Sequence, residues 1–169
     1  FYQPKSDDFS MWTTDSKHHP LSSNFVNCIA VDHGSIWIGT ETGGIIKLNP
    51  RPLQLENFAH STEPTSLSAN AVNAEADGTL WVGTVEGGLN RKAKEAKTFT
   101  HFTTANSSLS HNAVSTLAAD DHQNLWIGTW GGGLNLINLR THATIQRLKL
   151  PEVYARLTQF IGALCMDQR

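Results

Sequence analysis

Trp130 stands out in this sequence because an aromatic side chain at its position could contact a ligand. It follows a Trp-Ile-Gly-Thr sequence and precedes three glycines, whereas the corresponding positions elsewhere in the chain hold Glu41 and Val85. An exposed indole at the tip of a glycine-rich loop can stack on a sugar ring or face a partner protein. Trp130 is therefore the first candidate for ligand binding, and packing within its own repeat is the alternative interpretation.

Glu75 is the second candidate, because it interrupts a run of small and apolar residues. Alignment of the repeated segments places it where the other copies hold Ile29 and Leu117. A carboxylate on a strand needs a partner or water. We expect Glu75 to line a solvated channel, and contact with a ligand or an ion is the alternative.

The sequence indicates no catalytic residues, no metal site and no cofactor. It contains no Gly-x-Ser-x-Gly, P-loop or His-Glu-x-x-His sequence. The residues Asp32-x-Gly34-x-x-Trp37 are similar to the Asp-box turn of sialidases, where that turn is structural. The eight histidines are expected in surface loops, since the one close pair is adjacent in the chain: His18, His19, His33, His60, His101, His111, His122 and His142.

Composition restricts the class of protein. The 169 residues are 39% hydrophobic and 17% charged, and the net charge is −2. This balance gives no electrostatic reason to expect binding to nucleic acid. No apolar run reaches the roughly 20 residues that a membrane-spanning helix needs. Cys28 and Cys165 are far apart in the sequence, and we expect both to be free, buried thiols.

The elements that position these residues repeat at a fixed interval. Trp37, Trp81 and Trp126 are 44 and 45 residues apart, and each is followed by a glycine at the second position after it: Gly39, Gly83 and Gly128. A period of about 40 to 50 residues is typical of β-propellers. Each copy has an apolar strand, a Gly-Thr pair and a glycine-rich hairpin. We predict an all-β propeller segment of four-stranded antiparallel blades, with the tryptophans and glycines as structural residues.

Before each tryptophan, small residues at alternate positions predict an innermost strand, where blades converge and space is smallest. The series are Val26, Cys28 and Ala30; Val72, Ala74 and Ala76; and Val114, Thr116 and Ala118. A polar turn follows each strand. In the third copy Gln123 replaces the expected turn glycine, which predicts a longer or strained turn.

We predict three complete blades, at 21–66, 67–108 and 109–156. Residues 1–20 would supply the outer part of a preceding blade, with a strand at Phe9–Thr14, and residues 157–169 the first strand of a further one. Three blades do not close a ring, because propellers have about 4 to 8. The chain is therefore expected to be part of a longer propeller, or to assemble with a second copy, and to self-associate when isolated.

The pattern Leu-Ser-x-Asn-x-Val, then Asp, then Trp-Ile-Gly-Thr-x-x-Gly-Gly-Leu-Asn resembles the two-component regulator propeller repeat. The resemblance extends over nearly the whole chain. It implies the periplasmic sensor region of a hybrid histidine kinase, a class found mostly in carbohydrate-using bacteria. The expected function is to sense an oligosaccharide or similar small ligand. Two alternatives remain open: a propeller-fold hydrolase or lyase that acts on polysaccharide, and a protein-interaction scaffold.

Overall fold

The computed structural model describes residues 2–3, 8–18, 20–32, 34–58, 69–142, 145–149 and 159–166. These residues form strands and loops and no helix, so none of the described segments could cross a membrane as a helix. A short pair joins β1 (Tyr2–Gln3) and β2 (Asp8–Phe9). The remaining strands form three four-stranded sheets. The predicted all-β architecture of antiparallel four-stranded blades is confirmed.

Each sheet is a blade in which strands adjacent in sequence pair antiparallel. Blade 1 contains β3 (Val26–Asp32), β4 (Ser35–Thr40), β5 (Ile45–Pro50) and β6 (Leu53–Phe58). Blade 2 contains β7 (Ala69–Ala74), β8 (Leu80–Thr84), β9 (Leu89–Lys92) and β10 (Thr100–Phe102). Blade 3 contains β11 (Val114–Ala119), β12 (Asn124–Thr129), β13 (Gly133–Asn138) and β14 (Gln146–Arg147).

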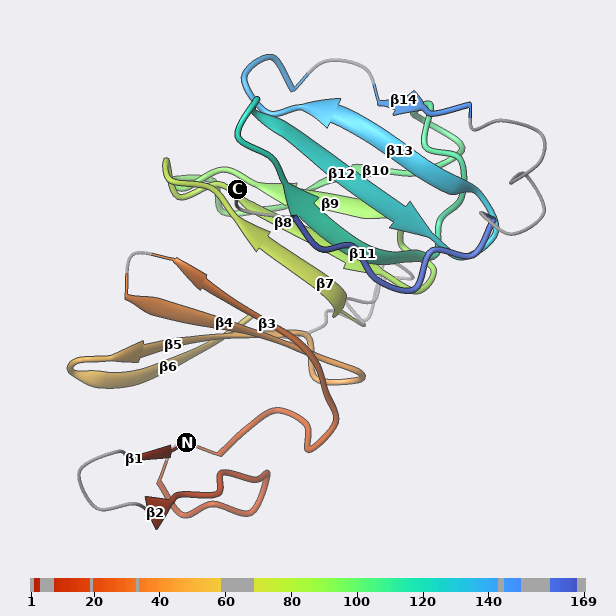
Figure 1. The fold of residues 1–169 in the computed structure, drawn as a ribbon. Helices are drawn as coiled ribbons and strands as arrows, with labels where there is room; N and C mark the ends of the chain where they lie inside the picture. Colours follow the sequence, from red (N-terminus) through yellow and green to blue (C-terminus); the bar gives the residue numbers. More distant parts are fainter. Residues whose placement is uncertain are drawn as a thin grey trace.

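The three blades follow one another through the molecule in chain order (Figure 1). Their first strands, β3, β7 and β11, lie side by side and form the inner edge of the arc. Polar side chains connect these strands. Asn27 Nδ2 donates to Asn70 Oδ1 at 3.4 Å, and Asn70 Nδ2 donates to the Val114 carbonyl at 3.4 Å. Ser115 Oγ continues the series by donating to the Ile161 carbonyl.

A buried threonine closes the central hairpin of every blade. Its hydroxyl donates to a backbone carbonyl four residues later, which fixes the hairpin between the second and third strands. The pairs are Thr40 with Gly44 at 2.8 Å, Thr84 with Gly88 at 3.0 Å and Thr129 with Gly133 at 2.8 Å. This hydrogen bond explains why each repeat has a threonine in its Gly-Thr pair.

The repeated glycine lies where the next blade approaches most closely. A Cβ atom on Gly83 would collide with the side chain of Val114, the first residue of β11. The equivalent atom on Gly39 would lie 3.1 Å from Ala69 Cβ, and that on Gly128 would lie 2.6 Å from Ile161 Cγ2. Each glycine therefore makes room for a side chain of the segment that follows its blade, and Gly39 and Gly128 also adjoin Cys28 and Thr116 of their own blades.

The strand register corrects the predicted alignment of the second repeat. Asn73 pairs with Trp81, as Ala30 pairs with Trp37 and Ala118 with Trp126. The innermost residues of blade 2 are consequently Ala69, Ala71 and Asn73, and the predicted series Val72, Ala74 and Ala76 is wrong.

The turn that precedes Trp81 explains this shift. The Glu75 N–H donates to the Thr79 carbonyl at 2.8 Å, and the Asp120 N–H donates to the Asn124 carbonyl at 2.9 Å. The β7–β8 turn therefore has the same length as the β11–β12 turn. Because register is counted from the turn, Glu75 corresponds to Asp120 and not to Leu117.

Two predictions about the ends of the chain are also wrong. The strand expected at Phe9–Thr14 does not extend beyond Phe9, where β2 ends. Phe160 forms an isolated bridge with Trp130, but residues 161–166 form no strand. They still lie beside β11, since the Leu164 N–H donates to Thr116 Oγ1 at 3.2 Å. Both cysteines are free, as expected, but Cys28 is only half-buried and Cys165 is exposed.

The turn with a strained residue is present as expected. Gln123 has a φ of 62°, in the left-handed region that favours glycine, and Gly34 and Gly78 occupy the same region in the other blades, at 84° and 87°. Arg140 Nε donates to Gln123 Oε1 at 2.9 Å, which holds the side chain in place.

Candidate functional site

The three repeated tryptophans occupy equivalent positions on the side of each blade that faces the next one. Trp81 is fully buried, Trp37 is nearly so, and Trp126 is half-buried. Trp37 packs against Phe58 with ring centroids 5.7 Å apart, and Trp81 packs against Phe102 at 5.9 Å. Trp126 lies on a face that no complete blade covers, which accounts for its greater exposure.

Glu75 lies in the turn after β7 and holds the indole of its own blade. Trp81 Nε1 donates to Glu75 Oε1 at 2.5 Å, and His142 Nε2 lies 3.7 Å from the same oxygen. In blade 3, Trp126 Nε1 donates in the same way to Asp120 Oδ2 at 2.9 Å. The expected strand position of Glu75 is wrong. Its part in ligand binding stays a prediction, and the contacts it makes are structural.

Asp77 and Asp120, which lie in these turns, are held in their charged form. Burial raises the pKa of Asp120, but hydrogen bonds from Asn124, Trp126 and His122 outweigh it and bring this pKa to about 2. The backbone hydrogen bond from Thr79 is the main reason why the pKa of Asp77 is lowered. Asp77 Oδ1 accepts this bond at 2.7 Å. The turns therefore depend on ionised carboxylates that bind local donors.

Trp130 lies in the hairpin between β12 and β13, and 45% of its surface is exposed. Its backbone N–H donates to the Ala113 carbonyl at 2.9 Å, so the hairpin is fixed to the start of blade 3. Glu75 lies in the turn that precedes its Trp strand, whereas Trp130 lies in the hairpin that follows one. The two candidates therefore occupy opposite ends of different blades and do not form one site.

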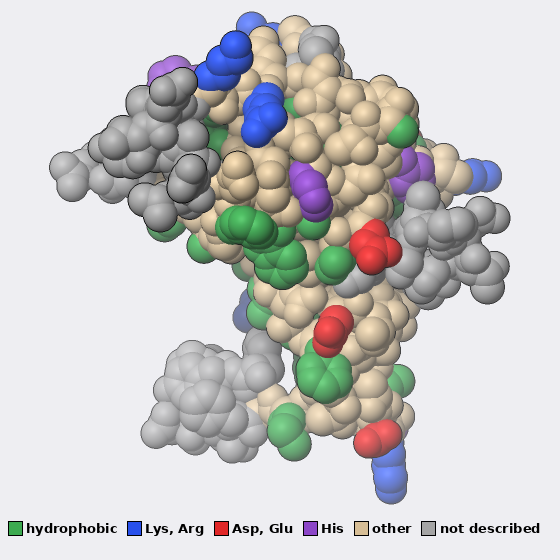
Figure 2. Space-filling model, turned by 90° about the vertical axis from the view of Figure 1, so that its right-hand side faces the viewer, with side chains coloured by type: hydrophobic (Ala, Val, Ile, Leu, Met, Phe, Trp, Pro, Cys, Tyr) green, Lys and Arg blue, Asp and Glu red, His purple; other side chains and the backbone are tan. Residues whose placement is uncertain are grey.

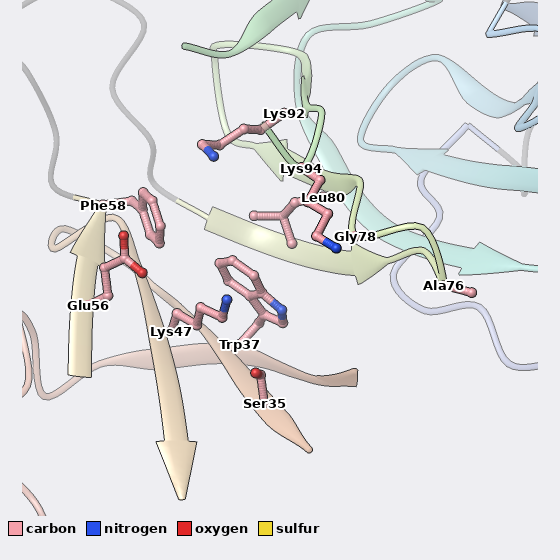
Figure 3. A pocket seen from close by; sticks show the side chains of 10 residues that line it. All are labelled: Ser35, Trp37, Lys47, Glu56, Phe58, Ala76, Gly78, Leu80, Lys92 and Lys94. Carbon is pink, nitrogen blue, oxygen red and sulfur yellow. The ribbon is translucent and has the colours of Figure 1, made fainter. Parts of the chain in front are cut away.

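A cavity of about 500 Å³ lies between blades 1 and 2 (Figure 3). Sequence reasoning missed it. Aromatic side chains of blade 1 and lysines of both blades surround the space. The lining residues are Ser35, Trp37, Lys47, Glu56 and Phe58 of blade 1, and Ala76, Gly78, Leu80, Lys92 and Lys94 of blade 2.

Two of these lysines lie over aromatic rings. Lys47 Nζ is 5.1 Å from the centroid of the Trp37 ring, and Lys92 Nζ is 5.5 Å from that of Phe58. Such contacts stabilise an ammonium group only modestly. Within the described part of the chain, the one ion pair within 4.0 Å joins His142 and Glu75. No described carboxylate therefore forms an ion pair with the lysines of the cavity.

A column of the repeat alignment could have indicated Lys92. The residue 11 positions after the repeated tryptophan is Leu48 in blade 1, Lys92 in blade 2 and Ile137 in blade 3. A lysine in an otherwise apolar column is the signal that was available. Only the structure shows that the side chains at this position of the third strand point toward the preceding blade.

The histidines that are described do not all lie in free surface loops. His142 packs on Trp81, with ring centroids 5.8 Å apart. His101 Nδ1 lies 2.5 Å from Oδ1 of the buried Asn90. Among the described residues, no group of three or more His, Cys, Asp or Glu side chains could hold a metal ion.

The chain matches a family model described as two component regulator propeller, at residues 20–42 and 108–131. No curated protein matches it significantly. These two matched segments contain the Leu-Ser and Trp-Ile-Gly-Thr elements of blades 1 and 3.

Solved structures share the fold. The extracellular domain of BT3049 from B. thetaiotaomicron, described as a hybrid two component system, is 28% identical with a TM-score of 0.70, and the match covers 84% of this chain and 19% of that one. The extracellular domain of BT4673 from the same organism, described as a one component system, is 21% identical with a TM-score of 0.67 over 81% and 20%.

A third structure is PorZ, a surface component of the type-IX secretion system of Porphyromonas gingivalis. It is 25% identical with a TM-score of 0.56, over 67% of this chain and 17% of that one. The present chain therefore spans about a fifth of the length of these proteins. Its residues 20–42 and 108–131 match the two-component regulator propeller repeat, the family that the sequence pattern resembles.

Proposed function

We propose that this chain is part of the ligand-sensing propeller of a two-component or related signalling receptor, located outside the cytoplasm. The observation that carries this proposal is the similarity to the extracellular domain of BT3049, together with the family repeats at 20–42 and 108–131. Within this proposal the segment binds a ligand and performs no catalysis. The location would be the periplasm, as the ectodomain of an inner-membrane receptor.

The ligand that we propose is a carbohydrate. The exposed indole of Trp130 offers an apolar face of the kind that stacks on sugar rings. Polar and charged side chains around the cavity between blades 1 and 2 could bind hydroxyl groups. Both features lie in loops or gaps between blades, where a propeller can bind ligands without disturbing its sheets.

A titration of the receptor ectodomain with a panel of oligosaccharides, followed by calorimetry, tests this function. The variant Trp130→Ala should bind the cognate glycan more weakly, and Leu53→Ala, which also shortens an exposed apolar side chain, should bind normally. Equal affinity of the Trp130 variant would remove this residue from the site. Cleavage of a glycan by the ectodomain would instead support the hydrolase or lyase alternative.

One face of blade 1 carries exposed apolar residues, which indicates what this segment contacts. Phe25, Ile29 and Val31 are 67%, 63% and 72% exposed, and they lie on or next to β3. On the face drawn in Figure 2, hydrophobic side chains gather toward the middle, while charged side chains are scattered. Apolar surface of this kind favours contact with another blade. We propose that the rest of its own propeller, or a second copy, covers it.

The isolated segment should therefore self-associate. Sedimentation of residues 1–169 at micromolar concentration should show dimers or larger species, because association buries the apolar residues of β3. Replacement of Ile29 and Val31 by Thr should reduce the association. A folded monomer of the unaltered segment would contradict the prediction.

A further inference from the structure

Two successive gaps between blades differ in what fills them. In the gap between blades 2 and 3, the buried Ile137 and the partly buried Leu139 pack in one hydrophobic cluster with Trp81. The strand register gives Ile137 the position of Lys92, since they pair with Leu125 and Leu80 respectively. Lys94, two residues after Lys92, corresponds to Leu139. The gap between blades 1 and 2 thus has lysines where its neighbour has apolar residues.

This replacement leaves a charged cavity. Lys47 and Lys92 are half-buried, and Lys94 is exposed at the margin. Glu56 also lines the space and offsets part of their charge, but it lies more than 4.0 Å from each ammonium group. Among the residues that the structure describes, three cations and one anion line the volume of about 500 Å³, which leaves an excess of positive charge. Partly buried ammonium groups without a carboxylate partner are costly and attract anions strongly.

The other walls suit an organic ligand and not a bare ion. Trp37, Phe58 and Leu80 supply apolar surface, and Ser35 supplies a hydroxyl group (Figure 3). Cavities of about 300 to 1,000 Å³ accommodate small organic ligands. The Glu56 carboxylate could accept hydrogen bonds from hydroxyl groups, an interaction that an anion alone would not make.

We propose that the cavity between blades 1 and 2 binds an acidic sugar, with the carboxylate of a uronic acid held by Lys47, Lys92 and Lys94. The choice of a sugar depends on the proposed carbohydrate-sensing function. The anionic group follows from the lysines alone. Trp37 and Phe58 contact the apolar faces of the ring, and Glu56 accepts from its hydroxyl groups.

Binding of glucuronate, glucose and inorganic sulfate to the receptor ectodomain tests this assignment by calorimetry. Glucuronate should bind at least tenfold more tightly than glucose, and its affinity should fall as salt is raised. The double variant Lys92→Ile, Lys94→Leu, which introduces the residues of blade 3, should lower the glucuronate affinity at least tenfold. The milder variant Lys92→Gln should lower it severalfold, and Lys97→Gln, an exposed lysine outside the cavity, should leave it unchanged.

Each other outcome overturns a defined part of the proposal. Equal binding of glucuronate and glucose, or unchanged affinity in a folded Lys92→Gln variant, would remove the lysine site. Sulfate binding as tight as that of glucuronate would overturn the assignment to a sugar. Signalling by a neutral glycan with no glucuronate binding would leave the proposed sensor function intact and refute this inference. Glucuronate binding without any signalling response would support the lysine site and contradict the proposed sensor function.

Discussion

The gap between blades 2 and 3 is a closed core, whereas the gap between blades 1 and 2 contains a cavity. Trp81 packs in one cluster with Ile137 and Leu139 of the following blade, and His142 covers its ring. Trp37 has Leu80 and Val82 of blade 2 in its cluster. Lys92 and Lys94 of that blade stand at the positions that Ile137 and Leu139 occupy in blade 3. The same repeat can therefore supply packing in one place and a solvated site in another.

The difference arises from few residues. The hairpin threonines, the inner strands and the Trp–Phe pairs are alike in blades 1 and 2. The residues that differ face the preceding blade and come from the third strand and the loop after it. The backbone framework of the propeller is thus maintained while side chains on one face determine whether the gap is open.

Replacement of the tryptophans by alanine should reveal the difference between the two gaps most clearly, as a difference in the loss of stability. Trp81→Ala should lower the free energy of unfolding by about 3 to 5 kcal/mol, because it leaves a large void in a closed core. Trp37→Ala should cost about 1 to 2 kcal/mol less, since one side of this indole already faces the cavity. Denaturant unfolding of the two variants measures the difference. Equal losses would show that the two gaps are packed alike.

An added methyl group at the blade junctions should have the next largest effect. Gly83→Ala should cost about 1 to 3 kcal/mol, because its Cβ would collide with Val114. Gly39→Ala should cost less, because the facing residue of the next blade is the smaller Ala69 and the other contact is with the single Sγ atom of Cys28. Thermal unfolding of the pair compares the junctions. A greater loss for Gly39→Ala would contradict the close approach at Gly83.

The period of the tryptophans was sufficient to predict the blades, because buried residues at fixed spacing specify the architecture. The register of the second repeat could not be predicted in this way. It depends on the Glu75–Thr79 backbone bond, and the run of alanines around β7 fits the inner strand in more than one register. Similarly, the alignment shows Lys92 at a position where the other blades have apolar residues. It does not show which neighbouring blade this side chain faces, because that depends on how the blades pack.

The carboxylate of Asp120, in the turn before Trp126, should make the stability of the protein depend on pH in the acidic range. The pKa of Asp120 is about 2, below its ordinary value of 3.8, so the ionised form stabilises the fold above about pH 4. This contribution is lost as the pH falls from about 4 to about 2. It should amount to about 1 kcal/mol, because the side chain is partly exposed.

The variant Asp120→Asn should therefore lose less stability than the unaltered protein over this pH range. Urea unfolding at pH 5 and at pH 3 measures the effect, and Asp121→Asn, for which the side chain is exposed, serves as the control. An identical pH dependence in the Asp120 variant and the unaltered protein would contradict the assigned role of this carboxylate.

The smallest effect is expected at the turn that differs among the blades. Gln123→Gly should stabilise the protein by about 0.5 to 1 kcal/mol, because glycine adopts the φ of 62° without a Cβ penalty. Loss of the hydrogen bond from Arg140 reduces the gain. Gly78→Ala, with a φ of 87° in the same turn of blade 2, should destabilise it. A decrease in melting temperature for Gln123→Gly would show that the side-chain contact outweighs the strain.

The close approach at the repeated glycines has a consequence for the curvature of the propeller. Beside each of these glycines lies one side chain of the segment that follows the blade, and its size limits how closely that segment can approach. That side chain is Ala69 at the first junction, Val114 at the second and Ile161 at the third. The chain thus carries spacers of increasing volume along its inner edge. We expect substitutions at these single positions to change the angle between successive blades, and through it the number of blades needed to complete a turn.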